Sequence, residues 1–190
     1  MDETKIYFAA DLHLFHKNII QLENRPFNCL EEMHECIINN WNKKISKLDK
    51  ALILGDLTFG NQKDSLKVVE RLNGNKYLIK GNHDKKPNNW YRDIGINNVS
   101  EFPILLNNYF IASHEPMLYI KYPFINIYGH VHNSPNFNTF TKSSICVSID
   151  RWNLGPVSMF CLIKHHREFL KYIESFANTY NIIYKQVKEN

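Results

Sequence analysis

Five short apolar runs along the chain are rich in β-branched and aromatic residues, which is typical of buried β-strands. They cover residues 5–10, 51–55, 76–81, 109–113 and 125–129. Each run ends in a small residue that is followed at once by aspartate, asparagine or histidine. Because parallel strands present sites at their carboxyl ends, this repetition predicts that the polar residues meet in one place.

The segments between the first three runs have helical periodicity. Apolar residues recur every three to four positions over residues 30–48, where Asn28 is expected to cap the helix, and again over 66–72. Alternating strands and helices predict an α/β fold whose parallel sheet has right-handed crossovers.

After residue 97 the pattern changes to closely spaced strands, which predicts a second, mixed sheet. These strands are expected at residues 101–106, 109–113, 124–129, 145–149 and 157–163.

The C-terminal segment, residues 165–187, is predicted to be an amphipathic helix. Its apolar face contains Phe169, Leu170, Ile173, Phe176, Ala177, Tyr180, Ile183, Tyr184 and Val187. We favour packing of this face on the chain's own sheet over packing in a dimer, so the protein is expected to be a monomer or a homodimer.

Composition limits the class of protein. The chain has 190 residues, of which 44% are hydrophobic and 22% are charged, as expected for one globular domain spanning residues 1–190. The formal charge of +4 favours an anionic ligand, but the lysines are too scattered to indicate nucleic-acid binding. Four cysteines without a CxxC pair, and no apolar run of membrane-spanning length, predict a cytoplasmic protein with reduced thiols.

The polar residues at the strand ends are oxygen and nitrogen donors of the kinds that bind divalent metal ions. They are Asp11, His13, Asp56, Asn82, His83, His114, His130 and His132. One ion with a position open to substrate needs three or four protein ligands, so this set predicts two ions that share a carboxylate. Carboxylates mixed with imidazoles suit Mn²⁺, with iron, Zn²⁺ or Ni²⁺ as alternatives.

Five short motifs carry a family resemblance. "DLH" at 11–13, "GD" at 55–56, "GNHD" at 81–84, His114 and "GHVH" at 129–132 resemble, in this order, the signature blocks of the calcineurin-like metallophosphoesterases. The match runs from Asp11 to about Asn153, and all five blocks are complete. The resemblance, closest to a group of small bacterial and phage phosphoesterases, implies a four-layer α/β/β/α sandwich of two mixed sheets flanked by helices.

The resemblance also implies a role for each residue. The first metal ion would be bound by Asp11, His13 and His132. Asn82, His114 and His130 would bind the second ion, and Asp56 would bridge the two. His83 and Asp84 would be catalytic, with His83 facing the substrate and Asp84 orienting it.

A two-metal phosphoester hydrolase is therefore the expected function. A hydroxide between two dications would attack phosphorus, and His83 would protonate the leaving oxygen or stabilise charge on the transferred group. We expect a phosphodiester or nucleotide-type substrate, with a phosphomonoester of a small metabolite as the alternative. A non-catalytic metal-binding scaffold is disfavoured, because such relatives lose ligands and this chain has kept them all.

The segment 14–28 is longer than in compact members of the family and is predicted to cover the substrate. His16 and Arg25 within it are candidate substrate-binding residues, since a guanidinium makes paired bonds to phosphate. Arg25 in a surface turn before Pro26 is the alternative. The segments 85–93 and 132–144 are expected to contribute to substrate selection.

Overall fold

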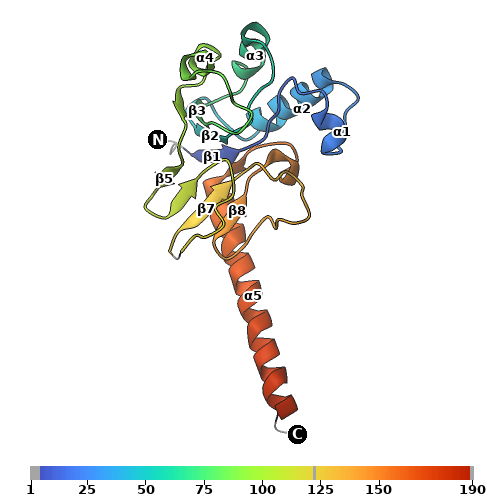
Figure 1. Ribbon diagram of the computed structural model, residues 1–190, viewed down its shortest axis with the longest axis vertical. Coiled ribbons are helices and arrows are strands. Elements are labelled where there is room, and N and C mark those ends of the chain that lie inside the picture. Colours follow the sequence, from blue (N-terminus) through green and yellow to red (C-terminus); the bar gives the residue numbers. More distant parts are fainter. Residues whose placement is uncertain (1–4, 122, 189–190) are drawn as a thin grey trace.

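The structure is a computed structural model that describes residues 5–121 and 123–188, with the side chains of the last helix described to Tyr172 and at Glu174. The chain forms two β-sheets that pack face to face, with helices against them (Figure 1). A core cluster containing Phe8 and Leu54 from one sheet and Ile127 and Ile145 from the other fills the space between them. Two mixed sheets flanked by helices were predicted, and the structure confirms them.

The first sheet has the strand order β4-β3-β2-β1-β9. Its parallel strands are β1 (Ile6–Ala9), β2 (Lys50–Leu54), β3 (Asn75–Ile79) and β4 (Asn98–Ser100). The two-residue strand β9 (Val157–Ser158) runs antiparallel to β1 at the sheet edge. The first three strands were predicted, whereas β4, which adds three residues beside β3, was not.

The second sheet has the order β5-β6-β7-β8. Its strands are β5 (Ile104–Leu106), β6 (Phe110–Ala112), β7 (Ile125–Tyr128) and β8 (Ser144–Cys146). β5 is antiparallel to β6, and the other pairs are parallel, so the prediction of a mixed second sheet is confirmed.

Helices on the outer face of the first sheet build a second core. They are α2 (Leu30–Asn42), α3 (Gln62–Val69) and α4 (Asn88–Asp93), while the short α1 (Ile19–Leu22) and the 3₁₀ helix η1 (Ile149–Arg151) lie in loops. Trp41, Val69 and Tyr91 point from these helices into the core. α2 begins after Cys29, not after the predicted cap residue Asn28, whose backbone N–H instead donates to Glu32 Oε2 at 2.9 Å.

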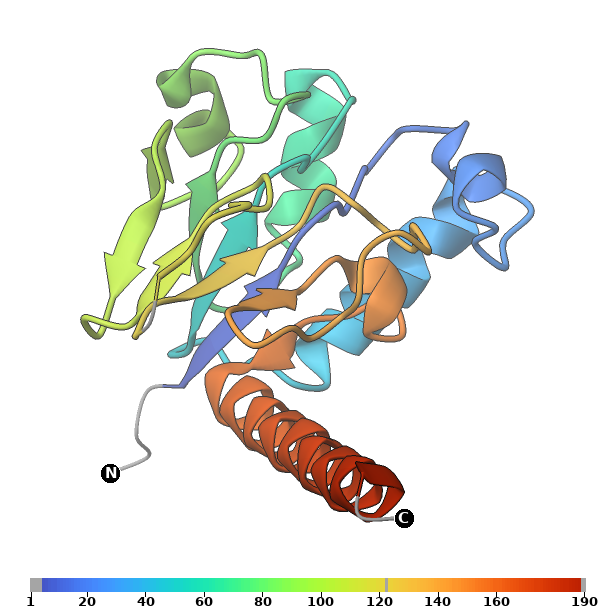
Figure 2. The same ribbon diagram turned by 60° about the horizontal axis from the view of Figure 1, so that its bottom comes forward.

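The last helix, α5 (Met159–Lys188), begins six residues before the predicted helix 165–187. The strand expected over 157–163 is therefore wrong beyond Ser158. Leu162 of α5 is buried in the core between the sheets. The next turns lie beside the second sheet, where His166 is buried with its Nε2 atom 2.8 Å from Thr141 O, and the C-terminal part of α5 extends away (Figures 1 and 2). Of the predicted apolar face, Phe169 and Leu170 have described side chains, and the members from Ile173 onward lie outside them.

No helix in the described ranges is long and apolar enough to cross a bilayer.

Candidate metal centre

The predicted donors lie in loops that leave the carboxyl ends of five strands. Asp11 and His13 follow β1, Asp56 follows β2, Asn82 follows β3, His114 follows β6, and His130 and His132 follow β7. The two sheets therefore both contribute donors, and the described side chains converge at one end of the space between them.

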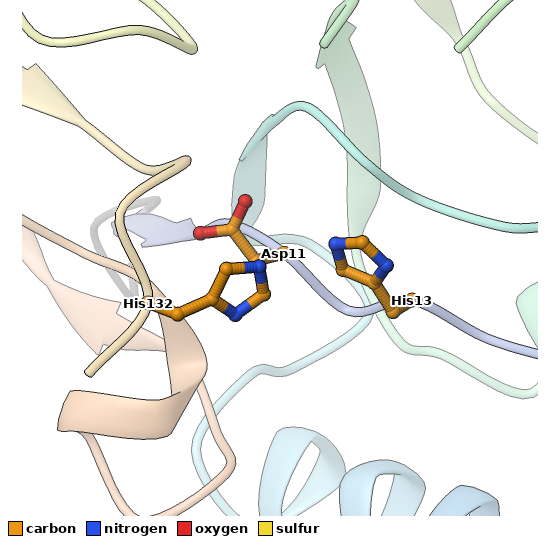
Figure 3. Close-up of side chains that lie close together, drawn as sticks. All are labelled: Asp11, His13 and His132. Atoms are coloured by element: carbon orange, nitrogen blue, oxygen red, sulfur yellow. The ribbon is translucent and has the colours of Figure 1, made fainter. Parts of the chain in front are cut away.

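One donor group consists of Asp11, His13 and His132, whose ligand atoms all lie within 4.8 Å of one another. Figure 3 shows these side chains facing a common space from the loops after β1 and β7. Burial lowers the pKa of His13 to about 4, so its imidazole is neutral at pH 7. His13 Nε2 is buried without a hydrogen-bond partner, which is costly for a polar atom unless a cation takes its lone pair.

A second donor group consists of Asn82, His114 and His130. Asn82 Oδ1 lies 2.8 Å from His114 Nε2 and 3.1 Å from His130 Nδ1, and the two imidazole nitrogens are 3.2 Å apart. His114 Nδ1 lies 2.8 Å from Leu54 O, which only accepts hydrogen bonds. In neutral His114 the proton is therefore on Nδ1, and the Nε2 lone pair faces an amide oxygen, an arrangement that a cation would stabilise.

Asp56 lies between the two groups. Its Oδ2 atom is 3.4 Å from His13 Nε2 and 3.5 Å from His114 Nε2, while Oδ1 accepts the backbone N–H of His83 at 3.0 Å. Burial opposes ionisation of this carboxyl, but the adjacent His13 and His114 imidazoles and the backbone N–H of His83 outweigh it and lower the pKa of Asp56 to about 2. One carboxylate oxygen is thus available to both donor groups.

Asp11 belongs to the same cluster and is fully buried. Its two carboxyl oxygens accept the backbone N–H of His130 at 3.0 and 2.9 Å, which ties the loop after β1 to the loop after β7. Burial raises the pKa of Asp11 to about 6, and a cation beside it would favour the charged carboxylate.

Five of the seven donors adopt the left-handed backbone region, which non-glycine residues rarely enter. Their φ angles are 60° at Asp11, 49° at His13, 54° at Asp56, 70° at His130 and 45° at His132. Backbone hydrogen bonds maintain two of these turns: the N–H of Asp11 donates to Gly55 O at 3.1 Å, and that of His13 to Asp56 O at 2.9 Å. Such strained residues cluster at functional sites.

Close packing explains Gly129, which precedes His130. A side chain at Gly129 would collide with the Ala10 side chain and come within 2.9 Å of Asp11 Oδ2. Gly55, which precedes Asp56, has a conformational reason for glycine, because its φ of 84° lies in the region that favours glycine.

Asp150 is a site residue that the sequence reasoning missed. Its Oδ2 atom lies 2.7 Å from His132 Nδ1, which leaves His132 Nε2 available as a ligand. Burial lowers the pKa of His132, but the hydrogen bond with Asp150 and the nearby carboxylates outweigh it, so the pKa is raised. Asp150 follows an apolar strand region, as the other donors do, and that pattern was the available signal.

Arg25 is buried under the site and not on its surface. Its guanidinium donates to Asp150 Oδ1 at 2.8 Å and Oδ2 at 3.1 Å, and to the backbone oxygens of Asp11 at 2.8 Å and Leu12 at 3.0 Å. A fifth N–H faces Met33 Sδ at 3.4 Å. All five donors are occupied, so the geometry does not support the expected grip on a substrate phosphate. The surface-turn alternative does not fit either, because Arg25 is buried. The contacts of Arg25 are those of a residue that positions Asp150 and the loop after β1.

Asp84 also differs from its expected role. The buried carboxylate accepts the backbone N–H groups of Asp56 at 2.7 Å, Leu57 at 3.2 Å and Gly81 at 2.9 Å. Within the described part of the chain it makes no hydrogen bond to the His83 imidazole. Asp84 therefore holds the loops after β2 and β3 together, and its orientation of His83 is indirect.

His83 and His16 lie at the mouth of the donor cluster. The His83 side chain is exposed, with its ring centroid 5.7 Å from that of His13. His16 is half-buried, and its Nδ1 atom lies 3.1 Å from His13 Nδ1. Both positions are compatible with contact with a substrate.

Comparison with known proteins identifies the family of the chain. A model of the calcineurin-like phosphoesterase family matches residues 4–172. The chain belongs to the calcineurin-like phosphoesterase family. This phosphoesterase is 34% identical over 175 residues to the uncharacterized protein MJ1445 of Methanocaldococcus jannaschii, covering 86% of this chain and 92% of that protein.

Two further relatives extend the comparison. The gene 66 protein of Mycobacterium phage L5 is 32% identical over 81 residues, or 41% of this chain and 39% of that protein. The crystal structure of a protein of unknown function from Aquifex aeolicus, AQ665, superposes with a TM-score of 0.68 at 24% identity, covering 85% of this chain and 99% of that one. This likeness supports the fold. Family membership makes the chain a phosphoester hydrolase of a class that uses divalent metal ions.

Proposed function

We propose that this phosphoesterase is a two-metal enzyme that hydrolyses phosphodiesters of the nucleotide type. Asp11, His13 and His132 would bind one ion, Asn82, His114 and His130 would bind the other, and Asp56 would bridge them. Mn²⁺ is the proposed metal, with iron, Zn²⁺ or Ni²⁺ as alternatives, because the donors combine carboxylate and amide oxygens with imidazole nitrogens.

The position of Asp56 Oδ2 is the observation that carries this proposal. The atom is almost equally far from His13 Nε2 and His114 Nε2, at 3.4 and 3.5 Å. The two nitrogens belong to different donor groups. A single shared ion would leave part of this set unused, whereas two neighbouring ions use every donor.

Bound divalent ions supply Lewis acidity, which lowers the pKa of water and stabilises the oxygens of a phosphoryl group. The chain's own residues orient this chemistry: Asp150 holds the His132 ring through Nδ1, and Asp84 fixes the loops that carry Asp56 and Asn82. The exposed His83 imidazole would donate a proton to the departing ester oxygen or stabilise charge on the phosphoryl group.

The surroundings of the centre favour a diester over a monoester. A groove of about 450 Å³ borders Asn82 and His114 and is also lined by Lys80, Ser113 and Met117. On the His13 flank the exposed Phe59 ring lies beside the centre. A phosphodiester has two ester groups: one would lie in this groove, and the other would lie beside the Phe59 ring.

The test compares two substrates after chelation and readdition of Mn²⁺. We expect metal-dependent hydrolysis of bis(p-nitrophenyl) phosphate to exceed that of p-nitrophenyl phosphate in kcat/KM. Asp56→Asn should lower activity by more than the roughly 10–100-fold typical of residues that only orient a ligand. The matched control Asp93→Asn, at an exposed position in α4, should leave activity unchanged.

A reversed substrate preference would identify a phosphomonoesterase. Full activity in Asp56→Asn would contradict the bridging role.

A further inference from the structure

Phe59 is an aromatic side chain at the mouth of the metal centre, and none of the three core clusters of described residues contains it. It is 42% exposed, although most large apolar side chains nearby are buried. Its ring centroid lies 4.3 Å from that of His16, 5.3 Å from His13 and 5.2 Å from His83. Core packing does not explain a solvent-exposed phenyl ring beside three imidazoles at the proposed catalytic centre.

The ring and its neighbours form a cluster of aromatic side chains, which we call the aromatic shelf and define as Phe59, His16 and His83. Phe59 and His16 are stacked with an angle of 20° between their planes, and His83 is tilted by 44°. The shelf borders the donor group that contains His13, so a substrate whose phosphate reached the centre would place one ester group over it.

The backbone holds the shelf in place before any ligand arrives. The Phe59 N–H donates to Leu14 O at 2.8 Å, and the Gly60 N–H donates to Thr58 Oγ1 at 3.1 Å. A side chain at Gly60 would come within 2.6 Å of the Phe15 ring, which fixes how closely this turn approaches the 14–28 segment. A surface that is already ordered loses little conformational entropy on binding.

We propose that the aromatic shelf stacks against the base of the substrate, which makes nucleoside phosphoesters the substrate class. This inference rests on the proposed phosphoesterase function and adds the group that the enzyme recognises. Stacking of a base on an aromatic side chain contributes about 1–3 kcal/mol and tolerates every base, because each has a π-face. The shelf therefore favours ligands that contain a base without discriminating between the bases.

Equilibrium binding tests the shelf without turnover. In the metal-loaded protein, isothermal titration calorimetry with adenosine 5′-monophosphate and with ribose 5-phosphate compares ligands that share phosphate and sugar and differ in the base. We expect the nucleotide to bind about 5- to 150-fold more tightly. Phe59→Leu should remove this preference and leave ribose 5-phosphate affinity unchanged, while Phe59→Trp should keep the preference.

The matched control is Phe160→Leu. Phe160 is 78% exposed and lies with Lys5 and Tyr7 at the opposite end of β1, so this variant should keep the wild-type preference.

Equal binding of both ligands by the wild-type protein would overturn the shelf while leaving the phosphoesterase proposal intact. A similar loss of affinity for both ligands in Phe59→Leu would assign Phe59 a structural role and also overturn it. Conversely, a Phe59-dependent nucleotide preference in a protein that hydrolyses neither p-nitrophenyl ester would support the shelf and contradict the proposed catalysis.

Discussion

Backbone strain at single residues is a feature of the proposed metal centre. A left-handed conformation costs an L-residue about 1–2 kcal/mol, and five proposed ligands adopt it. The cost is acceptable because the turns aim side chains from neighbouring strands at one point. At these positions the chain loses folding free energy and gains the side-chain directions that the site needs.

His130 allows this strain to be measured. It is exposed and has a φ of 70°, so replacement by glycine relieves the strain, whereas replacement by alanine keeps it. In the presence of a chelator, we expect His130→Gly to have a free energy of unfolding about 1 kcal/mol higher than His130→Ala. Urea denaturation of the two variants gives the difference.

The same pair of substitutions at Asn39 provides the control. Asn39 is exposed within α2, where alanine is favoured over glycine by about 1 kcal/mol, so the order of stability should be reversed. The same order at both positions would show that His130 is not strained.

At the residue scale, sequence reasoning recovers residues that follow a local rule and misses those defined by tertiary contacts. The seven donors all follow a strand, which is visible in one short window of sequence. Arg25 and Asp150 are 125 positions apart, and their ion pair becomes visible only when η1 comes to lie beside the 14–28 segment. Arg25 was therefore assigned to the substrate because an isolated arginine near a metal site suggests an anion.

At the scale of elements, the sequence predicted most strands and two of the helices. The strands β1, β2, β3, β5, β6, β7 and β8 and the helices α2 and α3 overlap predicted segments, while β4 and α4 were missed. The run "VSMFCLI" at 157–163 was misread as a strand, since a short apolar run does not distinguish the two states. The side chain of Ser158 resolves the ambiguity, because Ser158 Oγ accepts the Cys161 N–H at 3.1 Å.

Ser158 thus ends β9 and caps α5. Ser158→Ala leaves a backbone N–H in the first turn without its acceptor, and we expect a loss of about 1 kcal/mol in the free energy of unfolding. Ser158→Thr keeps a hydroxyl at the cap and should recover most of this loss. Urea denaturation monitored by circular dichroism measures both, and equal stability of the alanine variant and the wild type would argue against the cap.

At the scale of the whole molecule, the donors divide between the two sheets. Asp11, His13, Asp56 and Asn82 come from the first sheet, and His114, His130 and His132 from the second. Binding of ions that use both sets favours the folded chain, since the set is assembled only there.

Thermal unfolding with and without metal measures this coupling between metal binding and folding. Mn²⁺ at about 100 times its dissociation constant should stabilise the folded state by about 2.7 kcal/mol and raise Tm by several degrees. Asp56→Asn should lose most of the rise in Tm, and Asp93→Asn should keep it. An unchanged Tm in wild-type protein after addition of Mn²⁺ would contradict a metal centre between the sheets.

The bridging position of Asp56 has a further consequence for how the molecule is held together. All four cysteines are free, so no disulfide joins the two sheets in the described chain. Ions coordinated through Asp56 and the histidines of the second sheet would serve as a reversible crosslink. The same atoms would then set both the reaction rate and the lifetime of the folded enzyme, so a cell that restricts metal supply would deplete the protein as well as its activity.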